Sequence, residues 1–277
     1  MKELRTIIVT GASSGIGAYC ARALKADGWR VFATARGAAA LAALEAEGFE
    51  ALHLDYADPA SIERLVAQVL ARTGGRIDAL YNNGAYAQAG AVEDISVEVL
   101  RKQFEANFFG WHDLTRRIVP AMRRQGHGRI VHCSSILGMM PLPYRGAYCA
   151  SKYALEGLML SLRQELDGSG ICVSLIEPGP VASSLYDNGL PAFTGVIDQE
   201  NSAHREAYDR QMEQMRAGPG HGRRKASPEV VYKALRHALL SPRPRPHYVV
   251  TLPARAGILL KRILPASLFY RLLAKST

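Results

Sequence analysis

The sequence predicts an α/β fold: a doubly wound parallel sheet of about seven strands with helices on both faces. Short β-branched runs alternate with helical segments about six times along the 277 residues. This alternation is typical of parallel strands joined by crossover helices. A Gly-rich turn joins the first strand to the first helix, as is common in such folds. No repeat or domain boundary interrupts the pattern, so residues 1–277 are expected to form a single domain.

The first half of the chain alternates four predicted strands with three predicted helices. The strands span residues 6–9, 30–34, 50–55 and 77–81. The first helix spans residues 16–26, and an Ala-rich second helix stops at Gly48. The third helix begins after Asp58 and reaches residue 72, because Asp58 is a good N-cap and Pro59 suits the first helical position.

The second half contains longer helices and one long irregular insertion. Ser96 caps a predicted helix over residues 97–124, and a strand at 129–133 ends at Ser134-Ser135. A helix at 147–166 leads to a strand at 171–176, which Glu177-Pro178-Gly179 closes. Residues 181–226 are too long for a simple connection and are expected to form a substrate-binding loop or lid, with a helix at 203–215. A helix at 228–240 and a seventh strand at 247–251 follow.

Composition and charge argue against several classes of protein. The four cysteines form no C-x-x-C pair and the eight histidines show no metal-ligand spacing, so we expect reduced thiols and no metal. Neither a secretory leader nor a membrane-spanning run of apolar residues is recognisable, and a cytoplasmic protein is expected. The net charge of +9 would suit nucleic acid, an acidic membrane or a phosphorylated ligand. Nucleic acid ranks last, because the basic residues form no single patch interleaved with aromatic residues.

The Gly-rich turn after the first strand has the composition of a phosphate-binding site. Its glycines allow a tight turn and a close backbone approach to a pyrophosphate, and the following helix offers unpaired N–H groups. The spacing is G-x-x-x-G-x-G rather than the commoner G-x-G-x-x-G. The residues expected to contact the cofactor here are Gly11, Ser13, Ser14, Gly15, Ile16 and Gly17.

A second chemical signal is the pair Tyr148 and Lys152. Four residues are just over one helical turn, so both side chains project from one helix face. A nearby ammonium group favours the phenolate and lowers the pKa of the tyrosine towards neutrality. Such a tyrosine can serve as a general acid or base for an alcohol or ketone. The same spacing also occurs by chance on solvated helix faces.

These motifs occur in an ordered set that resembles the short-chain dehydrogenase/reductase family. Besides the Gly-rich turn and Tyr148-x-x-x-Lys152, the set contains Asn82-Asn83-Gly84-Ala85, Asn107, Ser135 and Pro178-Gly179, and it covers about residues 5–185. The resemblance implies a Rossmann-type sheet and an NADP-dependent oxidoreductase. Residues 33–36 and 177–183 look most like hydroxysteroid and retinoid dehydrogenases. The family usually has Asn-Asn-Ala-Gly, so the small residues at 84 and 85 are exchanged here.

The resemblance also implies a role for each catalytic residue. Tyr148 would exchange a proton with the substrate oxygen, and Ser135 would hydrogen-bond to the same oxygen. Lys152 would lower the pKa of Tyr148 and hold the ribose of the nicotinamide. Asn107 would hold a water molecule that links Lys152 to solvent; without the family, a solvent-exposed or locally bonded helical asparagine would be expected.

Cofactor choice depends on the end of the second strand. An acid there favours the ribose diol of NAD, whereas an arginine suits the 2′-phosphate of NADP. The sequence has no acid at this position but has Arg36, so NADP is expected rather than NAD. The resemblance adds further cofactor contacts: Asp55 at the adenine, Asn82 beside the adenosine ribose, and Gly84, Pro178, Gly179, Val181 and Ser183.

The substrate is expected to be an apolar alcohol, ketone or aldehyde. The segment between Ser135 and Tyr148 is apolar and borders the proposed reacting carbon. The expected substrate contacts are Ser135, Leu137, Met140, Leu142, Tyr148 and Tyr186. Simple core packing remains an equal alternative for each apolar residue of this set.

The C-terminal residues 254–277 mix apolar and basic side chains at helical spacing. Such an amphipathic helix could lie on an anionic membrane, cap the substrate entrance, pack on the body or contact another subunit. The resemblance implies a homodimer or homotetramer. Two other functions stay open: a cofactor-binding regulatory or scaffold protein without turnover, and a membrane-surface protein that acts through its tail.

Overall fold

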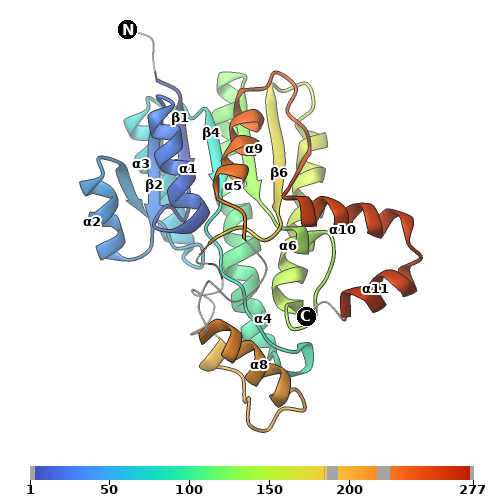
Figure 1. Cartoon of the computed structure of the whole chain (residues 1–277). Coiled ribbons are helices and arrows are strands. Elements are labelled where there is room, and N and C mark those ends of the chain that lie inside the picture. The colour runs from blue at the N-terminus through green and yellow to red at the C-terminus, as the bar shows by residue number, and fades with distance from the viewer. Residues whose placement is uncertain (1–3, 184, 186–192, 217–224, 275–277) are drawn as a thin grey trace.

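The computed structural model describes residues 4–183, 185, 193–216 and 225–274 and is built on one seven-stranded sheet (Figure 1). All six strand pairs are parallel, and the order is β3-β2-β1-β4-β5-β6-β7. The strands are β1 (Thr6–Val9), β2 (Arg30–Ala35), β3 (Glu50–His53), β4 (Ala79–Asn82), β5 (Gly128–Cys133), β6 (Ile171–Pro178) and β7 (His247–Val250). This confirms the predicted doubly wound sheet. The strand order reverses between β1 and β4, and ligands in such sheets bind at the carboxyl ends near that point.

Helices cover both faces of the sheet. The helices between and after the strands are α1 (Gly15–Ala26), α2 (Ala38–Ala46), α3 (Pro59–Arg72), α4 (Val97–Phe104), α5 (Gly110–Gln125), α6 (Gly146–Glu165) and α9 (Glu229–Leu240). Helix α1 packs on α9 on one face, whereas α3 packs on α5 on the other (Figure 1). Strands such as β1 and β4 are buried throughout, as expected for parallel strands that are covered on both sides. At α3, the Asp58 carboxylate accepts a hydrogen bond from the Ala60 N–H, which confirms the expected cap.

The predicted helix over residues 97–124 is present and begins at the expected cap, Ser96, but its hydrogen-bond pattern changes in the middle. A π-helical turn, Glu105–Phe109, separates α4 from α5 and contains the buried Asn107. The next residue, Gly110, lies so close to the chain after β3 that an added Cβ would be 2.4 Å from the Tyr56 carbonyl oxygen. The sequence pattern did not signal this turn, because one extra residue hardly changes a helical periodicity. Such single π turns are frequent at functional sites.

The two ends of the predicted loop at residues 181–226 are joined. Val181 and Ala226 form an isolated parallel bridge, with hydrogen bonds of 2.9 Å from Ala182 N to Ala226 O and from Ala226 N to Pro180 O. Within the described part of the loop, α8 (Arg205–Arg216) confirms the expected helix. Tyr208 from α8 packs in a cluster with Phe193 and the segment after β4. The loop therefore leaves and rejoins the sheet at one place.

The C-terminal segment forms two helices rather than one. They are α10 (Leu252–Ile263) and α11 (Ala266–Ala274), and the chain breaks at Leu264-Pro265 because proline cannot continue a helix. Helix α10 leaves the end of β7, and α11 turns back towards α6 (Figure 1). In the part of the chain that the structure describes, no helix is both long and apolar enough to cross a bilayer.

Candidate active site

A cleft lies at the carboxyl ends of β1, β2, β4, β5 and β6. It brings together most of the residues that the sequence singled out: Gly11, Ser13, Ser14, Gly15, Ile16, Arg36, Asp55, Gly84, Ser135, Tyr148, Lys152, Pro178, Gly179, Val181 and Ser183. Residues that the sequence reasoning did not select as cofactor contacts also line it, among them Thr34, Leu54, Tyr56, Asn83, Tyr86, Ala106 and Lys225. The cleft runs from the Gly-rich turn past Tyr148 to the start of the long loop.

The Gly-rich turn has a backbone that other residues would not fit. Gly11 has a φ of 62°, and an added Cβ would lie 2.5 Å from the Gly84 Cα. Gly17 does not line the cleft; an added Cβ there would lie 2.2 Å from the Gly11 carbonyl oxygen. Gly11 therefore shapes the turn, and Gly17 lets α1 pack against it. Ser14, the N-cap of α1, makes no side-chain capping hydrogen bond, so the first N–H groups of α1 lack this partner and suit an anion.

The ends of β1 and β4 are joined by a network around Thr10. Its Oγ1 accepts hydrogen bonds from the Asn83 N–H at 2.7 Å and the Gly84 N–H at 3.1 Å. The Tyr56 hydroxyl lies 2.8 Å from both Thr10 Oγ1 and Asn82 Oδ1. Asn82 is fully buried, and its amide donates to Thr115 Oγ1. Asn82, which was expected beside the adenosine ribose, does not line the cleft but joins the network below it, and the next residue, Asn83, lines the cleft.

Tyr148 and Ser135 face the cleft from α6 and from the end of β5. Both are buried, with 3% of Tyr148 and 8% of Ser135 exposed. Ser135 caps a short 3-10 helix, Ile136–Gly138, and its Oγ accepts a hydrogen bond from the Leu137 N–H at 3.1 Å. That contact fixes the hydroxyl oxygen and leaves its proton available to a ligand. Both hydroxyls therefore line the same cleft, as the sequence predicted.

Lys152 is fully buried one helical turn beyond Tyr148. Its Nζ donates a hydrogen bond to the Cys133 carbonyl at 3.0 Å and lies 4.0 Å from the centre of the Trp111 ring. The distance from Nζ to the centre of the Tyr148 ring is 5.8 Å. Burial lowers the pKa of Lys152 to about 8, because a low-dielectric surrounding disfavours the charged form. A solvated helix face is therefore the wrong interpretation of this pair.

Asn107 lies behind the cleft rather than in it. Its Nδ2 donates to the Tyr86 carbonyl at 2.8 Å, and its Oδ1 accepts from the Tyr86 N–H at 3.3 Å. Both side-chain groups are thus used to hold Tyr86, which lines the cleft. The asparagine is neither exposed nor bonded within its own helix. Its neighbour Ala106 reaches the cleft from the same π turn.

Charged groups are found at the two ends of the cleft. Arg36 follows β2 and is exposed, and no hydrogen bond or ion pair joins it to another described residue. Lys225 lines the cleft from the far end of the long loop. The Asp55 Oδ1 accepts a hydrogen bond from the Ala57 N–H at 3.0 Å, which fixes the turn after β3. Arg36 and Lys225, together with the buried Lys152, give the cleft three cationic side chains for an anionic ligand.

Of the predicted substrate residues, Ser135 and Tyr148 line the cleft, whereas the apolar Leu137, Met140 and Leu142 lie beside it. Leu137, Met140 and Leu142 pack in a cluster with Tyr148 and with Ala254 of α10. Leu185 belongs to this cluster and also lines the cleft. Tyr186 lies outside the described residues. The apolar surroundings of Tyr148 are thus built partly by core packing, which the sequence analysis left open.

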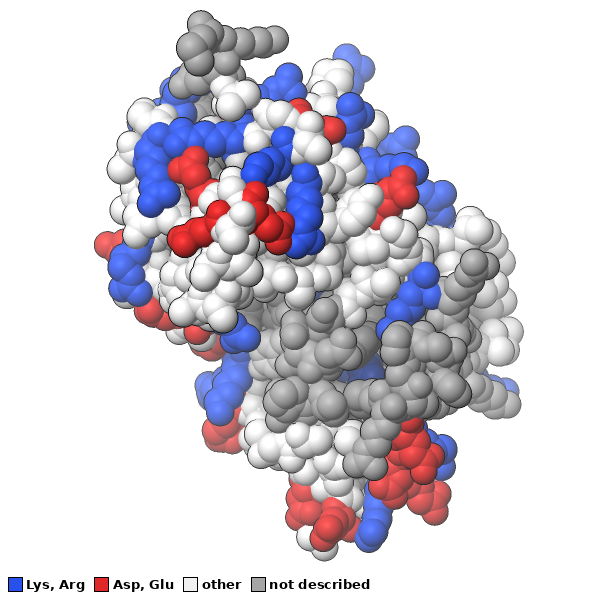
Figure 2. All heavy atoms as spheres, turned by 60° about the vertical axis from the view of Figure 1, so that its left-hand side comes forward, with Lys and Arg blue, Asp and Glu red and all other residues white. Residues whose placement is uncertain are grey.

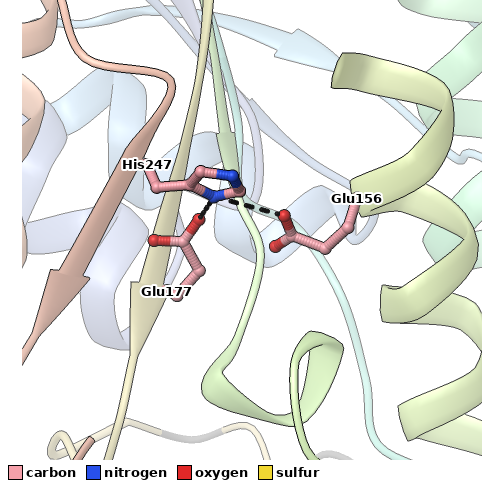
Figure 3. Close-up of side chains that lie close together, drawn as sticks. All are labelled: Glu156, Glu177 and His247. Atoms are coloured by element: carbon pink, nitrogen blue, oxygen red, sulfur yellow. Dashed lines mark hydrogen bonds and ion pairs between the residues drawn. The ribbon is translucent and has the colours of Figure 1, made fainter. Parts of the chain in front are cut away.

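Sequence reasoning missed a cluster of the buried Glu156 and Glu177 with the partly exposed His247 (Figure 3). Their ligand atoms lie within 4.8 Å of one another, and His247 Nδ1 is 2.7 Å from Glu177 Oε1 and 3.6 Å from Glu156 Oε2. Burial and the neighbouring Glu177 raise the pKa of Glu156, and the hydrogen bond to Glu177 raises the pKa of His247. The i+4 spacing of Glu156 after Lys152 was the available signal. The imidazole lies between the two carboxylates and reduces their repulsion.

Glu156→Gln is expected to stabilise the protein more at about pH 8 than at about pH 5. The pKa of the Glu156 carboxyl is raised from 4.5 to about 7 in the folded state. The free energy of unfolding of the wild type therefore falls as pH rises between these two values, because the folded state must give up a proton that it holds more tightly than the unfolded state does. The neutral amide escapes that loss, which we expect to amount to roughly 1–3 kcal/mol. Urea unfolding at both pH values measures it, with the exposed Glu165→Gln as control. A gain that does not depend on pH would contradict the expectation.

Comparisons with known proteins agree with this geometry. A family model described as short chain dehydrogenase matches residues 5–190. The chain is 39% identical over 270 residues to the uncharacterized oxidoreductase YbbO of Escherichia coli K12, which covers 97% of the chain and 94% of the relative. It is 34% identical over 219 residues to human retinol dehydrogenase 8, and the match covers 74% of the chain and 69% of that relative. The structure of an actinorhodin polyketide ketoreductase variant with NADPH superposes with a TM-score of 0.73 and is 29% identical in sequence. The superposition covers 90% of the chain and 97% of the ketoreductase.

Proposed function

The chain belongs to the short-chain dehydrogenase/reductase family, and we propose that it is an NADP(H)-dependent oxidoreductase acting on the alcohol or carbonyl carbon of an apolar substrate. The observation that carries the proposal is the meeting of Ser135, Tyr148 and the buried Lys152 in one cleft with the Gly-rich turn. A phosphate-binding turn and a proton-transfer group in one cleft are what a reductase requires.

The cofactor part of the proposal rests on the shape and charge of the cleft. The turn at Gly11 and the N-terminus of α1 would hold the pyrophosphate, and Arg36 would hold the 2′-phosphate of NADP. Lys152 would hydrogen-bond to the nicotinamide ribose. When bound, the cofactor supplies the hydride that the carbonyl carbon receives. A related ketoreductase of known structure carries NADPH, which supports a nicotinamide cofactor here.

The protein supplies the proton and the orientation of the substrate. In the reduction, the Tyr148 hydroxyl donates its proton to the carbonyl oxygen, and in the oxidation it takes that proton back. The Ser135 hydroxyl donates a hydrogen bond to the same oxygen and so fixes its position. The Lys152 ammonium favours the tyrosinate that forms, because an opposite charge nearby stabilises the ionised phenol. Asn107 positions the wall of the cleft by holding the backbone of Tyr86.

Arg36→Ala is expected to raise the KM for NADPH by about tenfold or more while changing the KM for NADH less than about twofold. A hydrogen bond to a charged phosphate is worth about 1.5–3 kcal/mol, and the variant loses this bond to NADPH. NADH has no 2′-phosphate, so its binding does not depend on the bond. Steady-state kinetics with both cofactors measures the change. The matched control is Arg76→Ala, another exposed arginine away from the cleft. A wild-type preference for NADH, or equal losses with both cofactors, would refute the role of Arg36.

The apolar substrate is supported by the residues next to Tyr148. Leu185 and Val181 line the cleft, and the cluster that contains Tyr148 is otherwise made of aliphatic and sulfur-containing side chains with alanine. One relative is named for retinol, an apolar alcohol. A panel of apolar ketones, aldehydes and alcohols, each assayed with both cofactors, tests the proposal. Tight NADPH binding without turnover of any of them would support the rival, a cofactor-binding regulatory or scaffold protein.

We further propose a homodimer or homotetramer in the cytoplasm. Several large apolar side chains are exposed on α4, the π turn and α6: Val97, Leu100, Phe109 and Tyr153. The family pairs through these helices, and burying such side chains favours association. All four cysteines are free, which suits a reducing compartment. Light scattering of the purified protein tests the assembly.

A further inference from the structure

We propose that the outer face of α10 and α11 docks on the surface of an anionic lipid bilayer. This goes beyond the proposed activity, because docking needs neither cofactor nor substrate. The surface is defined by the exposed apolar residues Leu252, Leu259, Leu260, Ile263, Leu268 and Leu272 together with the basic residues Arg255, Arg262 and Arg271. We call it the tail surface.

The charge of the protein is concentrated in the last 48 residues. Residues 1–229 contain 25 Lys and Arg and 25 Asp and Glu, so this part is balanced. Residues 230–277 contain nine Lys and Arg and no acid, so the whole net charge of +9 comes from them. Figure 2 brings the side with α1 and α2 forward, and there blue and red side chains lie next to one another. Two of the basic residues in 230–277, Lys233 and Arg236 of α9, pair with Glu229 and Asp27. Helices α10 and α11 contain Arg255, Lys261, Arg262 and Arg271 and no acid. A pair of helices with charges of one sign favours an oppositely charged partner.

Helix α10 has two opposite faces. Its inner face, at i, i+3, i+4 and i+7, contains the buried Ala254, the half-buried Gly257 and Ile258, and Lys261. Lys261 donates a hydrogen bond to the Met139 carbonyl. On the other side, Leu252, Leu259 and Ile263 are exposed by 79%, 57% and 67%. At 100° per residue these three fall within a narrow strip, and Arg255 and Arg262 lie along one edge of it. The outer strip therefore has no partner in the described fold and is bordered by cations along that edge.

Helix α11 repeats this arrangement. Phe269 is buried, whereas Leu268 and Leu272, four residues apart, are exposed by 41% and 50%. Tyr270 and Arg271 are exposed beside them. An apolar strip flanked by Arg and Tyr is the pattern of a helix that lies in the interfacial plane of a membrane. Two such helices in succession, joined at Pro265, give a larger surface than either alone.

The charge favours lipid over a second copy of this chain. A symmetric contact through the tail surface would bring together two segments that both lack acids, and the like charges would repel. Anionic headgroups, in contrast, attract each basic residue near the surface by about 1 kcal/mol. The apolar strip then adds the burial of its leucine and isoleucine side chains among the acyl chains. Lipid is thus the one occupant that satisfies both parts of the surface.

Docking would also bring the bilayer close to the substrate side of the cleft. The inner face of α10 contacts the apolar cluster that contains Tyr148, because Ala254 and Ile258 belong to that cluster. The outer apolar strip lies on the opposite face of the same helix. An apolar substrate that partitions into lipid would then be available close to the active site. This last step rests on the proposed function, whereas the docking itself does not.

Flotation of the full chain with lipid vesicles tests the docking without any turnover. We expect binding to vesicles of phosphatidylcholine mixed with phosphatidylglycerol, and about tenfold weaker binding to phosphatidylcholine alone or in high salt. The double variant Leu259→Asp/Ile263→Asp should bind about tenfold more weakly, since it places charge in the apolar strip. The variant Arg255→Gln/Arg262→Gln should lose the preference for phosphatidylglycerol. The control Leu4→Asp changes an exposed leucine of the body and should bind as the wild type does.

Each outcome decides the proposal, provided that circular dichroism shows each variant folded. Wild-type binding that both double variants retain would overturn it, and so would no binding to either vesicle. Light scattering distinguishes the other occupant: an oligomer that Leu259→Asp/Ile263→Asp dissociates, with no vesicle binding, would mean that the tail surface joins subunits. A negative result leaves the proposed reductase activity intact, because that activity is measured separately with soluble substrates.

Discussion

Tyr148→Phe is expected to lower kcat for carbonyl reduction by about 10²–10⁴-fold, the usual contribution of a general acid or base. The phenyl ring fills the same buried space but has no hydroxyl to donate a proton to the substrate oxygen. NADPH binding should change little, because the Gly-rich turn, Lys152 and Arg36 remain. Steady-state kinetics gives kcat, and the fluorescence of bound NADPH gives Kd.

The matched control for this variant is Tyr153→Phe. Tyr153 lies on the same helix, is 39% exposed and does not line the cleft. It should keep the wild-type kcat. If Tyr148→Phe retained full turnover with any substrate of the panel, Tyr148 would not be the proton donor.

Lys152→Met is expected to lower kcat/KM by about 10²-fold or more and to shift the pH profile of alcohol oxidation upward. The methionine keeps the apolar stem but removes the cation that favours ionised Tyr148. Oxidation needs the tyrosinate, so its rate should rise only as pH approaches the ordinary tyrosine pKa near 10. The Kd for NADPH should also increase, because the ribose loses a donor. A pH–rate profile of kcat/KM separates the proton effect from the binding effect.

The matched control here is Lys102→Met, on the exposed side of α4. Its pH profile should coincide with that of the wild type. An unshifted profile in Lys152→Met, with only KM for NADPH raised, would mean that Lys152 binds the cofactor without activating Tyr148.

The sheet and the Gly-rich turn could be predicted because their signals are local. Each strand is a short apolar run between turn residues, and α3 and α4 begin at side-chain caps, Asp58 and Ser96. The close approach of Gly11 and Gly17 follows from glycine at fixed positions in a strand–turn–helix. The spacing of Tyr148 and Lys152 placed both on one helix face, and both line the cleft.

The features that could not be predicted depend on tertiary contacts. The π turn at Glu105–Phe109 coincides with the close approach of Gly110 to Tyr56, which is far away in the sequence. Asn82 and Asn83 look equivalent in the sequence, and only the network around Thr10 and Tyr56 decides which one is buried. The cluster of Glu156, Glu177 and His247 joins three elements whose polar residues have no common spacing.

The two faces of α10 show the same limit. Helical spacing revealed an amphipathic segment, but the structure was needed to show that Ala254 and Ile258 pack beside Tyr148 while Leu259 and Ile263 remain exposed. Periodicity shows which residues share a face of a helix, whereas the tertiary contacts decide which face is buried and which remains exposed. The break before Pro265 has a local signal, the proline itself, but the sequence analysis expected one amphipathic segment through this residue.

Hydride transfer in this cleft is tested most directly with NADPH in which both hydrogens at C4 of the nicotinamide are replaced by deuterium. The product formed from an apolar ketone by the wild type is expected to carry one deuterium on the former carbonyl carbon, as measured by mass spectrometry. Tyr148→Phe should bind the same cofactor and form very little labelled product. Product without deuterium, or no product from any substrate despite tight NADPH binding, would contradict the proposed reaction.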